Sequence, residues 1–135
     1  MRTKSWLWVL SGLGLVGASM LPTAWAATPT ELLKGYAQQA GTPPSVTRGQ
    51  QFFNTRHGGQ WSCASCHGAS ASQDGKHAST GKVIRPLAPG FNPERLTDPS
   101  KVEKWFKRNC KDVLERECSA SGKADVMAWL IGVKP

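Results

Sequence analysis

The pattern of apolar and polar positions predicts a first helix soon after residue 27. Thr28-Pro29-Thr30-Glu31 has the order of a capping box, with proline at the first helical position. The apolar residues that follow at helical spacing are Leu32, Leu33, Tyr36, Ala37 and Ala40. Gly41 stands directly after them, so we expect the helix to end there.

A second helix is predicted from the capping residue Ser45 toward Arg56, after the connector Thr42-Pro43-Pro44. Gly49 and Phe53 lie four residues apart on one face of this helix. A glycine at such a position lets another helix approach closely. Ordinary amphipathic packing predicts the same apolar face, and both interpretations stay open here.

A third helix is predicted to begin at Asp98-Pro99, because aspartate caps helices and proline suits the first turn. Ser100 and Glu103 offer an alternative capping box. At about 100° per residue, two faces separate clearly. The apolar face holds Val102, Trp105, Phe106 and Asn109. The basic face holds Lys101, Lys104, Lys107, Arg108 and Lys111.

Asn109 is the unexpected residue of this third helix, since it falls near the middle of the apolar arc. A carboxamide aimed at an apolar surface is costly unless it is hydrogen-bonded or bound to a ligand. Either a buried backbone group or a bound group must therefore satisfy it.

A last helix is predicted after a serine cap, at Ser119 or Ser121, and it ends near Gly132. Its core face consists of Ala124, Val126, Trp129, Leu130 and Val133. Between residues 68 and 99, glycine, serine and proline interrupt every periodic pattern. Helices without a sheet predict an all-α single domain.

The motif Cys63-Ala64-Ser65-Cys66-His67 carries the clearest chemistry, because C-x-x-C-H is the attachment sequence of a c-type haem. Cys63 and Cys66 would form thioethers with the haem, and His67 would bind the iron through a neutral imidazole. The other ring nitrogen should donate to a backbone carbonyl, for which the turn Pro86-Leu87-Ala88-Pro89 is a candidate. The motif thus predicts one covalent iron haem. We expect residues 68–99 to wrap around it.

Three other uses of the two cysteines compete with haem attachment: a zinc pair, a thioredoxin-like pair and a plain disulfide. Zinc needs two further ligands at matching spacing, and Cys110 and Cys118 have no histidine beside them. A thioredoxin-like pair needs strand and helix alternation, which the pattern does not show. The histidine and the export signal described next favour haem over all three.

The first 26 residues have the features of a secretory signal peptide. Arg2 and Lys4 precede the apolar run Trp6–Leu21, and Ala24-Trp25-Ala26 is a small-residue cleavage sequence. Cleavage after Ala26 would leave residues 27–135 as a monohaem cytochrome c domain in the periplasm. An uncleaved membrane anchor is the alternative, but a run of about 16 residues is shorter than the roughly 20 that span a bilayer.

The charge of the chain predicts an acidic partner. Without Arg2 and Lys4, the 17 basic residues fall to 15 against 9 acidic residues, a formal charge of +6. Such an excess steers encounter with an acidic redox protein or an anionic membrane surface. No nucleic-acid recognition motif is present, so we expect no nucleic acid as partner.

An oxidising compartment favours a disulfide between Cys110 and Cys118. In a continuous helix their Cα atoms would lie ~12 Å apart, too far for a disulfide. We therefore predict a helix break within residues 111–117. The bridge then stiffens the backbone directly after Asn109, or it staples a small domain without regard to function.

The second axial ligand of the predicted haem is the open question. A methionine is usual in electron-transfer cytochromes c, yet Met127 lies within the last helix, where core packing is the default. His57 and His77 are each ten residues from His67, a tether that favours the haem rim. Asn109 remains a candidate whose amide oxygen suits hard ferric iron.

The chain resembles the sphaeroides haem protein family, oxygen-binding monohaem cytochromes c. The shared stretches are 62–69, 80–82, 86–89, 96–98, 102–106, 108–110, Cys118, 123–125 and 128–130. The Arg108-Asn109-Cys110 element with Cys118 is the most specific of them. The resemblance implies a class I cytochrome c fold with an additional N-terminal helix.

The family also implies roles for particular residues and partners. Asn109 would be a redox-labile axial ligand opposite His67, with the disulfide Cys110–Cys118 beside the haem. Ferrous iron would bind oxygen, nitric oxide or carbon monoxide. A dihaem cytochrome c and a membrane cytochrome b are the implied redox partners.

Two functions follow from this interpretation. One is a gas-binding haem protein, an oxidoreductase if it turns over oxygen or nitric oxide. The alternative is a simple periplasmic electron carrier with a permanent sixth ligand. Reduced spectra with and without carbon monoxide distinguish the two.

Overall fold

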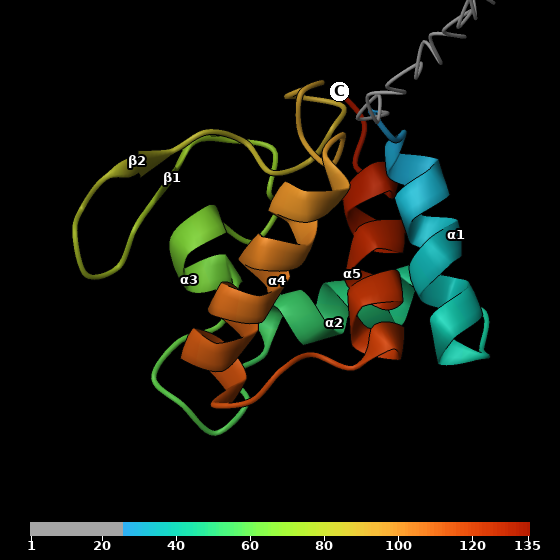
Figure 1. The fold of residues 1–135 in the computed structure, drawn as a ribbon. Helices are drawn as coiled ribbons and strands as arrows, with labels where there is room; N and C mark the ends of the chain where they lie inside the picture. Colours follow the sequence, from blue (N-terminus) through green and yellow to red (C-terminus); the bar gives the residue numbers. More distant parts are fainter. Residues whose placement is uncertain (1–25) are drawn as a thin grey trace, which may run out of the picture.

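The computed structural model describes residues 26–135, so the predicted signal peptide lies outside the described residues except for Ala26. Helices account for most of the ordered elements (Figure 1). The elements in chain order are α1 (Pro29–Ala40), α2 (Val46–Asn54), α3 (Ala64–His67), β1 (Gly75–Lys76), β2 (Val83–Ile84), α4 (Pro99–Leu114) and α5 (Ala120–Gly132). The all-α prediction is confirmed, apart from one short hairpin.

Capping residues start the helices where the sequence predicted them. Thr28 and Glu31 form the reciprocal capping box of α1, and Gly41 ends that helix with a left-handed φ of 65°. Asp98 accepts from the backbone N–H of Lys101 at 3.0 Å and so caps α4. The cap of α5 is Ser119 rather than Ser121, and Ser45 caps α2.

The core forms where α5 packs against both α1 and α2 (Figure 1). Phe53 of α2 and Leu130 of α5 are among its largest fully buried side chains. A Cβ added at Gly49 would collide with the backbone carbonyl of Asp125, so glycine lets α2 cross α5 in direct contact. The close-approach interpretation of Gly49 is thereby confirmed.

The fourth helix ends inside the predicted break. It runs to Leu114, and Glu115 then adopts a left-handed φ of 58° that turns the chain back. Cys110 and Cys118 are joined in a disulfide with a Cα separation of 5.5 Å. Both the predicted helix break and the predicted disulfide are therefore present.

The segment between α3 and α4 is irregular, as predicted, except for a two-residue antiparallel pairing of β1 with β2. Gly75 of β1 lies directly on the C-terminal end of α3, because a Cβ there would meet the backbone carbonyl of Cys66. Within residues 26–135, no helix has the length and apolar character needed to cross a membrane.

Candidate haem site

The Cys63–His67 turn is helical, and it is closed by two serines. Ser62 and Ser65 exchange backbone-to-hydroxyl hydrogen bonds of 2.9 and 3.2 Å around the start of the turn. The backbone N–H of His67 donates to the carbonyl of Cys63 at 3.1 Å. One helical turn therefore presents both thiols and the imidazole together.

The two thiols of this turn are not paired with each other. Cys63 and Cys66 are both half-buried and free, whereas the other two cysteines form the disulfide. Burial raises the pKa of the Cys63 thiol to about 11, which keeps it protonated at neutral pH. Because Cys110 and Cys118 are bonded to one another, they cannot complete a zinc site with this pair.

His67 has a buried and unsatisfied ring nitrogen. Its Nδ1 atom has no hydrogen-bond partner among the described residues. Burial, with smaller contributions from the charges of Arg95 and His77, lowers the pKa of His67 to about 4. The imidazole is therefore neutral at pH 7, the form that binds iron.

The turn Pro86-Leu87-Ala88-Pro89, which the sequence suggested as a source of a carbonyl for His67, makes other contacts. The carbonyl of Pro86 accepts hydrogen bonds from Arg95 Nε at 3.0 Å and from Asn92 Nδ2 at 3.3 Å. The turn does lie against the segment that follows α3, since the N–H groups of Leu87 and Ala88 both donate to the carbonyl of Ala71 at 3.0 Å. The turn thus lies beside the segment that follows the haem motif, and the carbonyl of Pro86 is held by Arg95, while His67 Nδ1 donates to no carbonyl of the turn.

Apolar side chains surround the Cys63–His67 turn. The Phe53 ring lies 6.0 Å from the His67 ring and 4.7 Å from Trp129 of α5. The partly buried residues packed on this core cluster are Phe52, Cys63, Ala64, Leu87, Leu96, Phe106 and Val133. These contacts fix the turn against α2 and α5.

The apolar face of α4 is only partly buried. Val102 is buried, as predicted, and Asn109 is half-buried. Trp105, on the same predicted apolar face, is 48% exposed. No hydrogen bond of the Asn109 side chain is found among residues 26–135, and its amide is not among the buried groups that lack a partner, so it is open to solvent or to a bound ligand.

This donor set fits a covalent haem. Two free thiols on one helical turn, a neutral imidazole with an unsatisfied nitrogen and an apolar lining meet the needs of a porphyrin. A porphyrin would also cover apolar surface of the kind that Trp105 and Trp61 expose, at 48% and 37%.

The other potential axial ligands are engaged elsewhere. Met127 is fully buried with Tyr36, Val102 and Ala124, so the expected core packing is confirmed. His57 Nε2 lies 2.8 Å from the carbonyl of Phe52, within its own segment. The ring of His77 accepts from the backbone N–H of Thr80 at 3.3 Å in the hairpin turn.

Sequence reasoning missed two groups of polar side chains that connect helices. Asp125 of α5 is 7% exposed and pairs with Arg48 Nε at 2.8 Å, while Ser45 donates its N–H to the same carboxylate. An aspartate between Ala124 and Val126 was the available signal, since a buried carboxylate needs a partner. The second group, centred on Glu103, gave no such signal.

The comparisons with known proteins agree on one family. A family model described as a domain of unknown function (DUF1924) matches residues 39–130. The cytochrome c-type protein SHP of Cereibacter sphaeroides is 42% identical over 126 residues, 90% of this chain and 91% of that protein. Cytochrome c'' of Methylophilus methylotrophus is 46% identical over 92 residues, 65% of this chain and 64% of that protein.

Solved structures of both relatives share the fold. Oxidized SHP, described as an oxygen-binding cytochrome c, gives a TM-score of 0.75 at 41% identity, covering 79% of this chain and 98% of its own. Oxidized cytochrome c'' gives a TM-score of 0.71 at 38% identity, covering 79% and 95%. A solution structure of cytochrome c'', which addresses haem-ligand detachment, gives 0.67 at 40%, covering 76% and 91%.

Sequence and structure therefore lead to the same cofactor and fold. The fold is the all-α cytochrome c fold, and the cofactor is one covalent haem c. The chain belongs to the sphaeroides haem protein family of c-type cytochromes, within the DUF1924 domain family.

Proposed function

We propose that this protein accepts electrons at its haem and binds a diatomic gas when the iron is ferrous. In this proposal Cys63 and Cys66 hold the haem covalently, and His67 supplies the permanent axial nitrogen. The haem supplies a one-electron centre and, when reduced, a coordination position for oxygen or nitric oxide. The residues of the chain decide when that position is accessible.

Asn109 is the residue that controls access in this proposal. Its amide oxygen is a hard donor that suits ferric iron better than ferrous iron. Reduction would therefore weaken the bond and free the distal position. The released amide keeps an N–H donor, and donors of a distal pocket favour the binding of polar diatomic ligands.

The observation that carries this proposal is that the competing side chains among residues 26–135 make other contacts. Met127 is fully buried in the core, and the rings of His57 and His77 contact backbone groups of their own segments. Asn109 is half-buried on α4 and directly precedes the disulfide-bonded Cys110. The Asn109 side chain is thus half-buried beside a disulfide, and it makes no hydrogen bond to another of residues 26–135.

The relatives support both halves of the proposal. Oxidized SHP is described as an oxygen-binding cytochrome c, which supports gas binding. The cytochrome c'' work concerns haem-ligand detachment, which supports a labile axial ligand. Detachment in one relative and oxygen binding in another are the two steps that we combine here.

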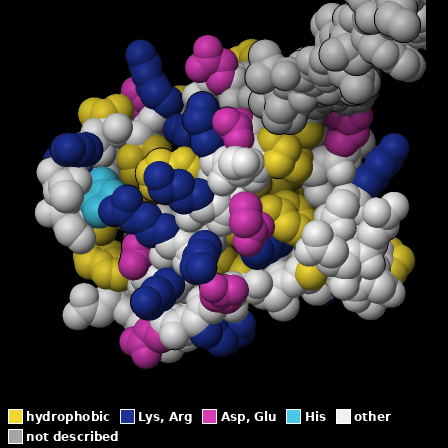
Figure 2. Space-filling view, in the orientation of Figure 1, with side chains coloured by type: hydrophobic (Ala, Val, Ile, Leu, Met, Phe, Trp, Pro, Cys, Tyr) yellow, Lys and Arg dark blue, Asp and Glu magenta, His cyan; other side chains and the backbone are white. Residues whose placement is uncertain are grey.

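The proposed location and partners follow from charge. We place the mature domain, residues 27–135, in the periplasm, where the predicted signal peptide would deliver it. Figure 2 shows Lys and Arg side chains gathered over the face where α4 lies in Figure 1. The basic residues of α4 are Lys101, Lys104, Lys107, Arg108 and Lys111. Such a face favours an acidic electron donor, for which a dihaem cytochrome c, supplied by a membrane cytochrome b, is our candidate.

Reduced spectra of the purified holoprotein test the proposal. We expect a high-spin ferrous spectrum that shifts fully on addition of carbon monoxide. A low-spin ferrous spectrum unaffected by carbon monoxide would instead identify an electron carrier with a permanent sixth ligand. Nitric oxide should then be added to the reduced protein as the second gas.

A further inference from the structure

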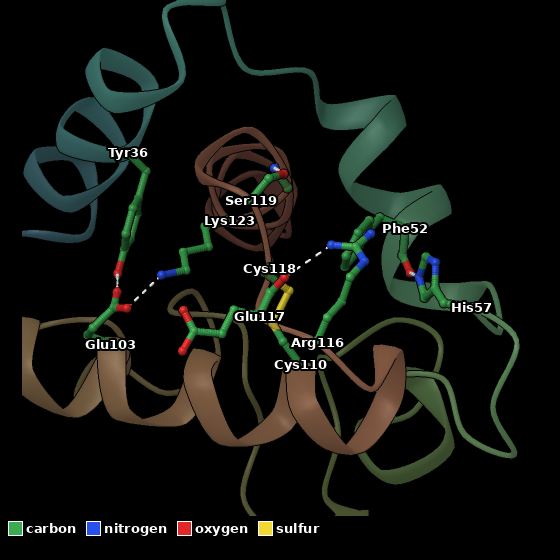
Figure 3. Close-up of a disulfide and its surroundings, with 11 residues drawn as sticks. Tyr36, Phe52, His57, Glu103, Cys110, Arg116, Glu117, Cys118, Ser119 and Lys123 are labelled. Atoms are coloured by element: carbon green, nitrogen blue, oxygen red, sulfur yellow. Dashed lines mark hydrogen bonds and ion pairs between the residues drawn. A yellow bond between two sulfur atoms is a disulfide. The ribbon is translucent and has the colours of Figure 1, made fainter.

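Glu103 is the point at which two other helices hold α4. Tyr36 of α1 donates its hydroxyl to Glu103 Oε2 at 2.8 Å, and Lys123 of α5 donates to Glu103 Oε1 at 2.6 Å. Figure 3 shows both side chains reaching the same carboxylate from their separate helices. We call Tyr36, Glu103 and Lys123 the α4 clamp.

The α4 clamp is more enclosed than an ordinary surface ion pair. The Lys123 side chain is 12% exposed, and its amine lies 5.3 Å from the centre of the Tyr36 ring and 6.0 Å from that of Phe106. Aromatic rings at these distances stabilise a lysine cation and shield the amine of Lys123 from water, whereas the Glu103 side chain is 51% exposed. The pair of Lys107 with Glu117 is a contrast, because it spans 3.8 Å with both side chains about 70% exposed.

A second anchor holds α4 further along the same side. Cys110 follows Glu103 by seven residues, and seven residues rotate a helix to about 20° short of two full turns. The disulfide of Cys110 therefore fixes α4 about 10 Å along the axis from the clamp, at nearly the same angle. Two anchors on one side fix both the tilt and the rotation of a helix, whereas one anchor leaves a pivot.

Asn109 lies on a different side of α4 from both anchors. It follows Glu103 by six residues, so the two side chains point about 120° apart around the helix. Anchors that hold one side of the helix thereby aim the other side, on which Asn109 and Trp105 lie one turn apart. A small rotation of α4 about Cys110 would move the carboxamide of Asn109.

We propose that the α4 clamp is a positioning device for Asn109, and that Tyr36 and Lys123 set the strength of its ferric coordination by holding Glu103. This inference rests on the proposed role of Asn109 as axial ligand. The N-terminal helix α1 thereby acquires a function, since Tyr36 is its contribution to the clamp. Loosening the clamp weakens ferric coordination without touching the haem attachment.

The test compares Glu103→Gln with Glu117→Gln in the holoprotein. Each variant removes one carboxylate that pairs with a lysine, but only Glu103 joins α4 to α1 and α5. We expect Glu103→Gln to raise the ferric high-spin fraction and to weaken ferric coordination by Asn109 about tenfold, as for loss of one charge-assisted hydrogen bond. A tenfold weakening raises the one-electron reduction potential by about 59 mV. Tyr36→Phe should act in the same direction to a smaller extent.

A double-mutant cycle separates positioning from the simple loss of a negative charge. Removing the Glu103 carboxylate raises the potential electrostatically whether or not Asn109 is present. In the Asn109→Ala background, we therefore expect Glu103→Gln to leave the spin state unchanged and to shift the potential no more than Glu117→Gln does. Equal effects of Glu103→Gln in both backgrounds would overturn the inference.

A readout independent of the haem spectrum is backbone hydrogen exchange along α4. Glu103→Gln should speed exchange of amides between residues 103 and 109, while Glu117→Gln should not. Unchanged exchange and an unchanged ferric spectrum in Glu103→Gln would overturn the clamp alone. An unchanged ferric spectrum in Asn109→Ala would instead overturn the proposed function, so the two failures are distinguishable.

Discussion

Cys110 is bonded to Cys118, with 5.5 Å between their Cα atoms, at the position directly after Asn109 on α4. The helix continues to Leu114 before Glu115 reverses the chain, so the bridge ties the final turn of α4 to the segment that enters α5. In Figure 3 this disulfide and the α4 clamp hold the same helix at separate points. The backbone that carries the proposed distal ligand, Asn109, is therefore cross-linked at the next residue.

Removing this disulfide should reduce both stability and axial coordination. The double variant Cys110→Ala/Cys118→Ala opens a short loop, for which loop entropy predicts a loss of about 2.5 kcal/mol in the free energy of unfolding. The freed end of α4 should also raise the ferric high-spin fraction. Guanidinium denaturation and ferric absorption spectra measure the two effects. A purely structural staple would lower stability and leave the ferric spectrum unchanged.

Gly49→Ala should destabilise the crossing of α2 over α5. The added methyl group would overlap the backbone carbonyl of Asp125, which cannot move without displacing α5. We expect a loss of about 3 kcal/mol or more, within the range for overpacked cores. Gly35→Ala is the matched control, because nothing lies within 4 Å of its added Cβ and alanine favours the helix by about 0.5 to 1 kcal/mol. Thermal unfolding of both variants should give opposite shifts, and a tolerated Gly49→Ala would refute direct contact between these helices.

Arg48→Ala should leave a buried carboxylate without its cation. Asp125 is 7% exposed and receives two hydrogen bonds from the Arg48 guanidinium, each 2.8 Å long. The Arg48 side chain is itself 54% exposed, but without it the Asp125 carboxylate would keep only the N–H of Ser45 as a partner, so we expect a clear loss in the free energy of unfolding. Arg56→Ala is the control, since Arg56 is exposed and no ion pair of its side chain is found among the described residues. Urea denaturation should show a large loss for the first variant only, and equal losses would mean that the pair contributes little.

The α4 clamp should also make stability depend on acidity. The hydrogen bond from Lys123, aided by the one from Tyr36, lowers the pKa of Glu103 below its usual value of 4.5. Because the folded pKa is the lower one, this stabilisation is fully present above the unfolded pKa and is lost as pH falls through the folded pKa. Glu103→Gln should therefore lose less thermal stability between pH 7 and pH 3 than the unmodified protein. Equal losses over that interval would contradict the assigned pKa shift.

Local signals explain why the helices could be predicted from the sequence. Thr28, Asp98 and Ser119 cap helices through residues three positions away, and Gly41 ends one through its own backbone. Such interactions depend only on neighbouring residues, so they can be predicted from a short stretch of sequence. The hairpin of β1 and β2 was missed because each strand has two residues, and its position depends on Gly75 contacting the distant turn of α3.

Long-range polar contacts explain what the sequence could not predict. Tyr36 and Glu103 are separated by 67 residues, and Arg48 and Asp125 by 77. Nothing local selects these partners, because Tyr36 and Glu103 are brought together by α1 and α4, and Arg48 and Asp125 by the packing of α2 on α5. The hydrogen bond from Arg95 to the carbonyl of Pro86 was not predictable for the same reason, since it forms only in the folded chain. The C-x-x-C-H motif was recognisable because its chemistry is local, whereas the interpretation of Asn109 needed a family resemblance.

The measurement that tests the account most directly is the ferric spectrum of the Asn109→Ala holoprotein, with Met127→Leu as its control. We predict that Asn109→Ala retains covalent haem but becomes high-spin or water-bound when oxidised, while Met127→Leu keeps the ferric spectrum of the unmodified protein. An unchanged low-spin ferric spectrum in Asn109→Ala would contradict the account.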